Sequence, residues 1–282
     1  MDAPITHWPA PAKINLFLHV TGRREDGYHE LQTVFQFISL ADSLSVEITR
    51  DASIRRRKST PGVAEKDDLI IRAAKALQQA TECKQGCILA LEKEIPMGAG
   101  LGGGSSDAAT TLLALNHLWH TGLTRDALAD IGNQLGADIP VFIHGRAAWA
   151  EGTGDELTAI DPAETDFLLV VPPIHVETAK IFKHQRLTRD TPAKKIRGFP
   201  PSGHSETFRN DLEAVARMEY PVVDDVIQFL RRWGEPRMTG SGSGVFMAFA
   251  DMDVAEKARR SMPEDWKSYL VRGFNKHPLA DL

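Results

Sequence analysis

The chain of 282 residues contains only two cysteines, Cys83 and Cys87. Two cysteines cannot build a disulfide framework, and the stretch C-K-Q-G-C has no second Cys/His cluster to complete the four ligands of a zinc site. No apolar run is long enough to cross a bilayer, because the longest, 167–171, ends in two prolines and is typical of a buried strand. The N-terminus also lacks the basic and apolar regions of a secretory signal. We therefore expect a cytoplasmic globular protein.

An excess of positive charge is absent as well. The net charge is -5, whereas proteins that bind a nucleic-acid backbone usually carry a large positive excess. The one dense basic run, Arg55 to Lys58, has no aromatic residues among its charges, and we expect a solvated loop there. Charge thus argues against nucleic acid as a partner and leaves small anionic ligands open. The length suits two closely packed domains.

Hydrophobic periodicity predicts a mixture of helices and strands. Alternating apolar residues between Ala12 and Thr49, broken near residue 42, predict an antiparallel opening sheet. Further strands are expected at 87–94, 166–171 and 268–272, and helices at 67–80, 106–119, 124–135, 177–184, 206–218, 222–233 and 253–262. We expect a surface loop at 185–205 and no helix at 136–145, a short segment that contains a proline. Strands and helices do not alternate regularly, so the fold class is α+β.

The stretch P-M-G-A-G-L-G-G-G-S-S-D-A-A, 96–109, follows an expected strand and precedes an expected helix. A Walker-type phosphate loop is excluded, because no lysine follows these glycines. The spacing of Gly98, Gly100 and Gly103 also fits a dinucleotide fingerprint, yet no strand ending in an acidic residue follows the helix. The same spacing occurs in protein kinases, but their V-A-I-K and H-R-D motifs are missing here. A flexible linker is not expected between a strand and a strong helix.

What phosphate-binding loops share is their physics. Glycines let the backbone approach an anion, backbone N–H groups point inward, and the positive end of the following helix faces the charge. Asp107, in the first helical turn, would repel phosphate and should point away or help to hold a cation. The predicted phosphate-binding residues are Pro96, Met97, Gly98, Ala99, Gly100, Leu101, Gly102, Gly103, Gly104, Ser105 and Ser106.

This stretch resembles the central motif of the GHMP kinases, named for galactokinase, homoserine kinase, mevalonate kinase and phosphomevalonate kinase. P-A-K-I-N-L-F-L-H-V near the N-terminus and M-T-G-S-G-S-G-V-F near the C-terminus resemble the other two motifs, in the right order. The resemblance implies an ATP-binding domain at 1–155 with a left-handed βαβ unit, an α/β-sandwich-like domain at 156–282, and an active site in the cleft between them. It implies ATP as phosphate donor and Mg²⁺ with it, without identifying a metal ligand.

Within the family, R-E-D-G-Y-H-E-L-Q-T-V-F, L-G-A-D-I-P-V-F and R-N-D-L-E are similar to one branch. Its members transfer the γ-phosphate of ATP to the 2-hydroxyl of a cytidine diphosphate-linked methylerythritol, in non-mevalonate isoprenoid biosynthesis. The resemblance implies that Asp138 is the catalytic base and Lys13 its partner, since phosphoryl transfer needs a carboxylate near the attacking hydroxyl and a cation near the moving charge. It implies the substrate-binding residues Asn15, Tyr28, His29, Thr178 and Phe182, with the Tyr28 and Phe182 rings enclosing the cytosine.

Other interpretations remain open at this point. Without the resemblance, Asp138 would be a turn residue that caps backbone N–H groups before Pro140, and the two aromatic residues would be core or turn residues. The enzyme could also act on another small alcohol such as mevalonate or homoserine, or the chain could be a non-catalytic nucleotide-binding regulator. The chain departs from the family where Asp67-Asp68 replaces a common asparagine and where it reads P-P-I-H-V-E-T before Thr178. It could be a monomer or a homodimer.

Overall fold

A computed structural model describes residues 6–58, 64–200 and 207–282. Within these ranges the strands form one mixed sheet with the order β3-β4-β2-β10-β7-β9-β8, while β1 and β5 also pair with β2, and β6 pairs with β5. Helices and strands do not alternate regularly, as expected for the α+β class. The strands are β1 Thr6–Arg23, β2 His29–Thr49, β3 Ile54–Arg56, β4 Gly86–Glu92, β5 Ala148–Glu151, β6 Glu156–Ala159, β7 Asp166–Val171, β8 Arg237–Met238, β9 Val245–Ala248 and β10 Lys267–Phe274.

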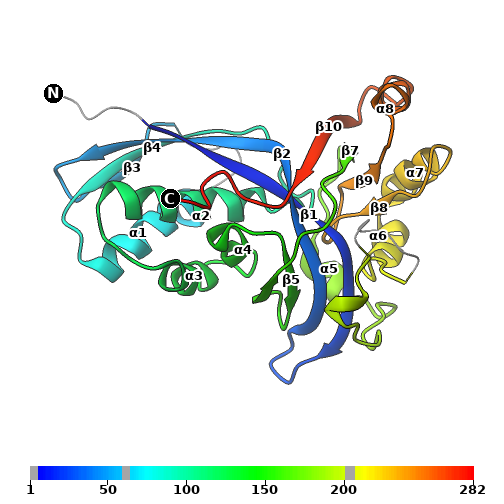
Figure 1. Cartoon of the computed structure of the whole chain (residues 1–282), viewed down its shortest axis with the longest axis horizontal. Coiled ribbons are helices and arrows are strands. Elements are labelled where there is room, and N and C mark those ends of the chain that lie inside the picture. The colour runs from blue at the N-terminus through cyan, green and yellow to red at the C-terminus, as the bar shows by residue number, and fades with distance from the viewer. Residues whose placement is uncertain (1–5, 59–63, 201–206) are drawn as a thin grey trace.

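Two long antiparallel strands, β1 and β2, extend from the helices of the first half toward those of the second half (Figure 1). The predicted antiparallel opening is confirmed, but β2 is a single strand where the sequence predicts a break near residue 42. The reason is that Asp42 does not form a turn. Its carboxylate accepts hydrogen bonds from the backbone N–H groups of Glu94 and Ile95, at 2.6 and 2.8 Å, and so ties β2 to the segment that follows β4.

Four helices of the first half lie together beneath the sheet in Figure 1. They are α1 Leu69–Thr81, α2 Gly103–Leu118, α3 Arg125–Asn133 and α4 Ile139–His144. Helix α2 begins three residues earlier than predicted, inside the glycine run. The prediction of no helix at 136–145 was wrong: Pro140 lies in the first turn of α4, where a missing N–H costs nothing and the fixed φ favours the helix.

The basic run is only in part the predicted solvated loop, because the side chains of Arg55, Arg57 and Lys58 are exposed whereas that of Arg56 is not. Arg55 and Arg56 belong to β3, which pairs parallel with β4, and α1 lies between these two strands along the chain. The Arg56 guanidinium forms a buried ion pair with Asp68 at 2.7 Å, and each side chain is 9% exposed. Asp68 also caps α1 by accepting from the N–H of Ile70. Arg56, although it belongs to a run of basic residues, therefore joins β3 to the start of α1.

The second half places β7 between β10 and β9, with helices packed beside them. These helices are α5 Thr178–Lys183, α6 Glu213–Glu219, α7 Pro221–Leu230 and α8 Met252–Arg260. In place of the helix predicted at 206–218, α6 begins at Glu213; residue 206 lies outside the described residues. Asn210, just before α6, donates its side-chain N–H groups to the carbonyls of Met238 and Gly240. The predicted loop 185–205 contains one 3-10 turn, Ile196–Gly198, and its residues 201–205 also lie outside them.

The hydrophobic core joins the two halves. Leu18 and Val20 of β1 pack in one cluster with Leu168 and other apolar residues of the second half. At its end the chain returns to the first half, where the N–H of Ala147 donates to the carbonyl of Asn275 (Figure 1). The division of the chain after residue 155 stays a prediction. Among the described residues, no helix is both long and apolar enough to span a membrane.

Candidate active site

The glycine run folds into a loop whose backbone approaches its neighbours closely. Gly98, Gly100 and Gly102 have φ of +69°, +72° and +67°, a region that side chains disfavour. Alternating left-handed residues aim successive N–H groups to one side, as in anion-binding nests. Gly102 is the N-cap of α2 and provides no side-chain cap. The first N–H groups of this 16-residue helix are therefore available to a negatively charged ligand.

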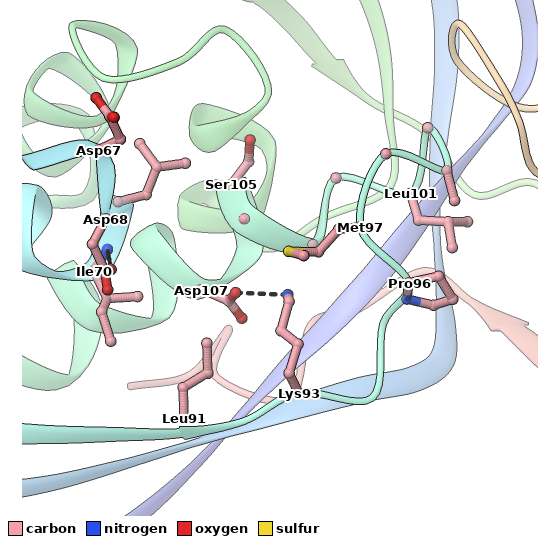
Figure 2. Close-up of a pocket in the computed structure, with 17 residues that line it drawn as sticks. Asp67, Asp68, Ile70, Leu91, Lys93, Pro96, Met97, Leu101, Ser105 and Asp107 are labelled. Atoms are coloured by element: carbon pink, nitrogen blue, oxygen red, sulfur yellow. Dashed lines mark hydrogen bonds and ion pairs between the residues drawn. The ribbon is translucent and has the colours of Figure 1, made fainter. Parts of the chain in front are cut away.

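A cavity of about 350 Å³ opens beside this loop (Figure 2). The loop and the start of α2 form one wall, and Asp67 and Asp68 lie on the opposite side in the view. Ten of the eleven predicted phosphate-binding residues line it, and the buried Ser106 does not. The cavity is lined by Asp67, Asp68, Leu69, Ile70, Leu91, Lys93, Pro96, Met97, Gly98, Ala99, Gly100, Leu101, Gly102, Gly103, Gly104, Ser105 and Asp107.

Lys93 explains how Asp107 fits beside a phosphate-binding loop. The Lys93 ammonium forms ion pairs with the buried carboxylates of Asp42 and Asp107, the latter at 2.8 Å (Figure 2). Burial raises the pKa of Asp107 to about 7; the Lys93 charge opposes this rise and the Asp42 charge adds to it. The predicted alternatives for Asp107 were to point away or to help to hold a cation. The cation it contacts belongs to the chain itself.

Lys13 and Asp138 come together although 124 positions of sequence separate them. Lys13 lies on β1, 3% exposed, and its Nζ is 3.3 Å from Oδ2 of Asp138 at the start of α4. The ammonium also donates to Oδ1 of Asn15 at 2.7 Å and to the carbonyl of Gly100 at 3.2 Å. The Asp138 side chain is 36% exposed and makes no capping bond to α4, which argues against the alternative of a turn residue that caps backbone N–H groups before Pro140.

A second cavity, of about 650 Å³, begins at this ion pair. It shares Gly98, Gly100 and Gly102 with the first cavity, so the glycine loop lies between the two. Every predicted catalytic and substrate-binding residue lines it: Lys13, Asn15, Tyr28, His29, Asp138, Thr178 and Phe182. Residues from β1, β2, α4 and α5 thus converge on one space. The residues that line the cavity therefore come from both halves of the chain.

The aromatic residues at one end of this cavity differ from the predicted pair. The His29 ring, at the start of β2, lies 5.1 Å from the Phe182 ring of α5, with 34° between the planes. Tyr28 lines the same cavity but is 68% exposed, at the turn between β1 and β2. Burial, followed by the positive charges of Arg189 and Arg23, lowers the pKa of His29. A neutral imidazole beside an aromatic ring is suited to contact a planar heterocycle.

Sequence reasoning missed several residues of the site. Thr239 accepts a hydrogen bond from the N–H of Asn15 at 2.9 Å, and Ser241 lies 2.7 Å from the hydroxyl of Thr178. Both belong to the C-terminal glycine motif, so a signal existed, but no single residue of it stood out. His175 lies so close to Gly98 that an added Cβ there would be 2.0 Å from its Nδ1. No local pattern marks His175 or Arg189.

Two family models match the chain. The GHMP kinases N terminal domain matches residues 68–146, and the GHMP kinases C terminal matches residues 202–268. The first match includes the glycine loop and Asp138, and the second includes the motif around Thr239. One match thus lies in each half of the chain.

Relatives match over the full length. A 4-diphosphocytidyl-2-C-methyl-D-erythritol kinase of Xanthomonas axonopodis pv. citri (strain 306) is 50% identical over 285 residues, covering 100% of this chain and 96% of the relative. One of Dechloromonas aromatica (strain RCB), with the same name, is 50% identical over 277 residues, covering 98% and 99%. A crystal structure of 4-(cytidine 5'-diphospho)-2C-methyl-D-erythritol kinase has a TM-score of 0.83 and 33% identity, covering 95% of this chain and 99% of that one.

Proposed function

Because the chain belongs to the GHMP kinase family, we propose that it transfers the γ-phosphate of ATP to the 2-hydroxyl of 4-diphosphocytidyl-2-C-methyl-D-erythritol. This reaction belongs to non-mevalonate isoprenoid biosynthesis. The observation that carries the proposal is the 650 Å³ cavity, which joins the Lys13–Asp138 pair to the His29–Phe182 pair. Mevalonate and homoserine carry no base, so they would leave the second pair without a partner. The relatives with this name add independent support.

The chemistry divides among the chain's own residues. Asp138 accepts the proton of the substrate hydroxyl as its oxygen attacks the γ-phosphorus, the bond to the β-phosphate oxygen breaks, and ADP leaves. The Lys13 ammonium, 3.3 Å from the carboxylate, lies near the charge that moves. Asn15 holds the ammonium from the other side and can orient the methylerythritol hydroxyls. The N–H groups of the glycine loop and of the first turn of α2 hold phosphate oxygens.

Recognition of the substrate occurs at the other end of the cavity. Phe182 offers a ring face to the cytosine, and His29 offers a hydrogen bond that identifies it. The exposed Tyr28 side chain can cover the other face of the base when the substrate is bound. The hydroxyl of Thr178 is hydrogen-bonded to that of Ser241, which belongs to the C-terminal glycine motif. The tight placement of Phe182 and His29 on two different elements favours a rigid base site.

Mg²⁺ accompanies ATP in the proposed reaction and would neutralise charge on the phosphates. Among the described residues there is no cluster of three or more His, Cys, Asp or Glu side chains suited to a metal ion. We propose that the Mg²⁺ ion is held mainly by phosphate oxygens and water, as is common for this ion. A cytoplasmic location and the choice between monomer and homodimer stay predictions.

An ADP-release assay with a panel of alcohols tests the substrate. The purified protein should release ADP with 4-diphosphocytidyl-2-C-methyl-D-erythritol and show only background release with mevalonate or homoserine. Turnover of mevalonate but not of the cytidylyl compound would overturn the proposal in favour of a different GHMP kinase. ATP binding without turnover of any alcohol would instead favour a nucleotide-binding regulator.

A further inference from the structure

Arg189 lies in the polar connection that follows α5, and it uses four of its five N–H groups. Its Nε donates to Nε2 of His29 at 3.1 Å. Its Nη1 donates to the carbonyl of Leu187 at 3.1 Å, and its Nη2 donates to the carbonyls of Phe182 and His184 at 2.9 and 2.8 Å. The side chain is half-buried and lines the 650 Å³ cavity. A guanidinium held by this many acceptors has a fixed position.

This network joins the two walls of the base end. Phe182 and His184 lie at the C-terminal end of α5, where carbonyls lack partners within the helix and a positive charge is favoured. The Nε of the same guanidinium reaches His29, the first residue of β2. One arginine thus sets the position of the His29 ring relative to the Phe182 ring, across two elements that are far apart in the sequence.

The contact also decides where His29 carries its proton. A guanidinium has donors and no acceptor, so Nε2 of His29 must accept the hydrogen bond from Arg189. In a neutral imidazole the other nitrogen then holds the proton. The positive charges of Arg189 and Arg23 and the burial of the ring all favour its neutral form. His29 is left with a single polar group to offer a ligand, the donor Nδ1–H.

We propose that Arg189 is a positioning residue that locks His29 as a hydrogen-bond donor through Nδ1 and thereby makes the base end of the cavity select cytosine over uracil. The selection rests on the proposed function. Cytosine presents N3 as an acceptor, whereas N3 of uracil carries a hydrogen and donates. A His29 ring free to change tautomer could accept from uracil, but the ring held by Arg189 cannot. The wrong base is therefore rejected by two donors that face each other.

Nitrogen NMR of the free protein tests the lock without any substrate. In ¹⁵N-labelled wild-type protein above the pKa of His29, the Nδ1 resonance should show the bound proton and Nε2 should not. In Arg189→Ala the proton should move mainly to Nε2, the form that a neutral imidazole prefers when unconstrained. Arg186→Ala is a matched control, because this exposed arginine lies three positions earlier and its Nη1 contacts the Met218 sulfur. An unchanged His29 tautomer in Arg189→Ala would overturn the proposal.

Kinetics with the cytidine and uridine forms of the substrate test the selection. The ratio of kcat/KM for cytosine over uracil should fall about tenfold or more in Arg189→Ala, because a mismatched donor no longer opposes uracil. The change should appear mainly in KM, since base contacts act equally before and during phosphoryl transfer. Arg189→Lys keeps the charge and supports folding but loses the planar guanidinium with its fixed set of donors. The ratio of kcat/KM for cytosine over uracil should therefore fall by the same factor in this variant.

The outcomes separate this inference from the proposed function. A wild-type ratio retained in both Arg189 variants would overturn the role of Arg189 in base selection. Turnover of neither nucleotide compound by the wild type would overturn the proposed function and the selection of cytosine with it. In that case the NMR measurement still decides by itself whether Arg189 controls the His29 proton.

Discussion

Gly100→Ala should disable the glycine loop by a backbone collision that a matched variant avoids. A Cβ at Gly100 would lie 2.3 Å from the carbonyl oxygen of Thr239, where 3.4 Å is an ordinary contact. The loop and the Thr239 segment would have to separate by roughly 1 Å, and a misplacement of this size in an active site can cost on the order of 100-fold in rate. The movement also pulls on the bond between Thr239 and Asn15. The left-handed φ of +72° adds about 1–2 kcal/mol of strain for any side chain.

Gly122→Ala is the control, since Gly122 has a φ of +69° and nothing within 4 Å of an added Cβ. Both variants share the backbone strain, so their difference isolates the collision. Urea denaturation should show about 1 kcal/mol of destabilisation for Gly122→Ala, with nearly wild-type ADP release, and a larger loss of stability for Gly100→Ala. Gly100→Ala should also lose about 100-fold in kcat/KM. Equal activity in the two variants would refute the argued contact between the two glycine motifs.

Two further predictions concern the ends of the two cavities. Phe182→Ala should raise KM for the cytidylyl substrate about 5- to 150-fold with little change in kcat, because stacking of a base on an aromatic ring contributes about 1–3 kcal/mol to binding. A fall in kcat alone would contradict the stacking role. The folded-state pKa of Asp107, about 7, lies above the ordinary value of 3.8 for an aspartate, so Asp107 makes the fold less stable as the pH rises from about 4 to 7. Asp107→Asn should therefore gain more stability relative to wild type at pH 8 than at pH 5 in urea denaturation, and a gain independent of pH would count against this.

The glycine loop was recognisable from local residues, because glycines between an expected strand and an expected helix suit an anion-binding backbone. The roles of Lys13 and Asp138 came only from the resemblance to the GHMP kinases and stay predictions. Residues whose role comes from a distant partner were not recognisable. Asp42 looked like a turn residue, yet its carboxylate accepts hydrogen bonds from backbone N–H groups of the segment after β4. Arg56 looked solvated, yet it is buried against Asp68.

The same limit explains Arg189 and α4. Arg189 lies in a polar connection, and its partner His29 is 160 positions away, so nothing near it indicates a role. Helix α4 is only six residues long, and its stability comes from the burial of Ile139, Phe142 and their neighbours against α2 and α3, not from its own propensity. Tertiary contacts, which periodicity does not reveal, determine both features.

The rate of phosphoryl transfer by Asp138→Ala tests the central claim most directly. ADP release with the cytidylyl substrate should fall by about 10²–10⁴-fold, because the variant has no group to accept the hydroxyl proton. ATP affinity, measured by calorimetry, should stay close to wild type, since the glycine loop and the 350 Å³ cavity do not include this carboxylate. A variant that retains wild-type turnover would contradict the assignment of Asp138 as the base.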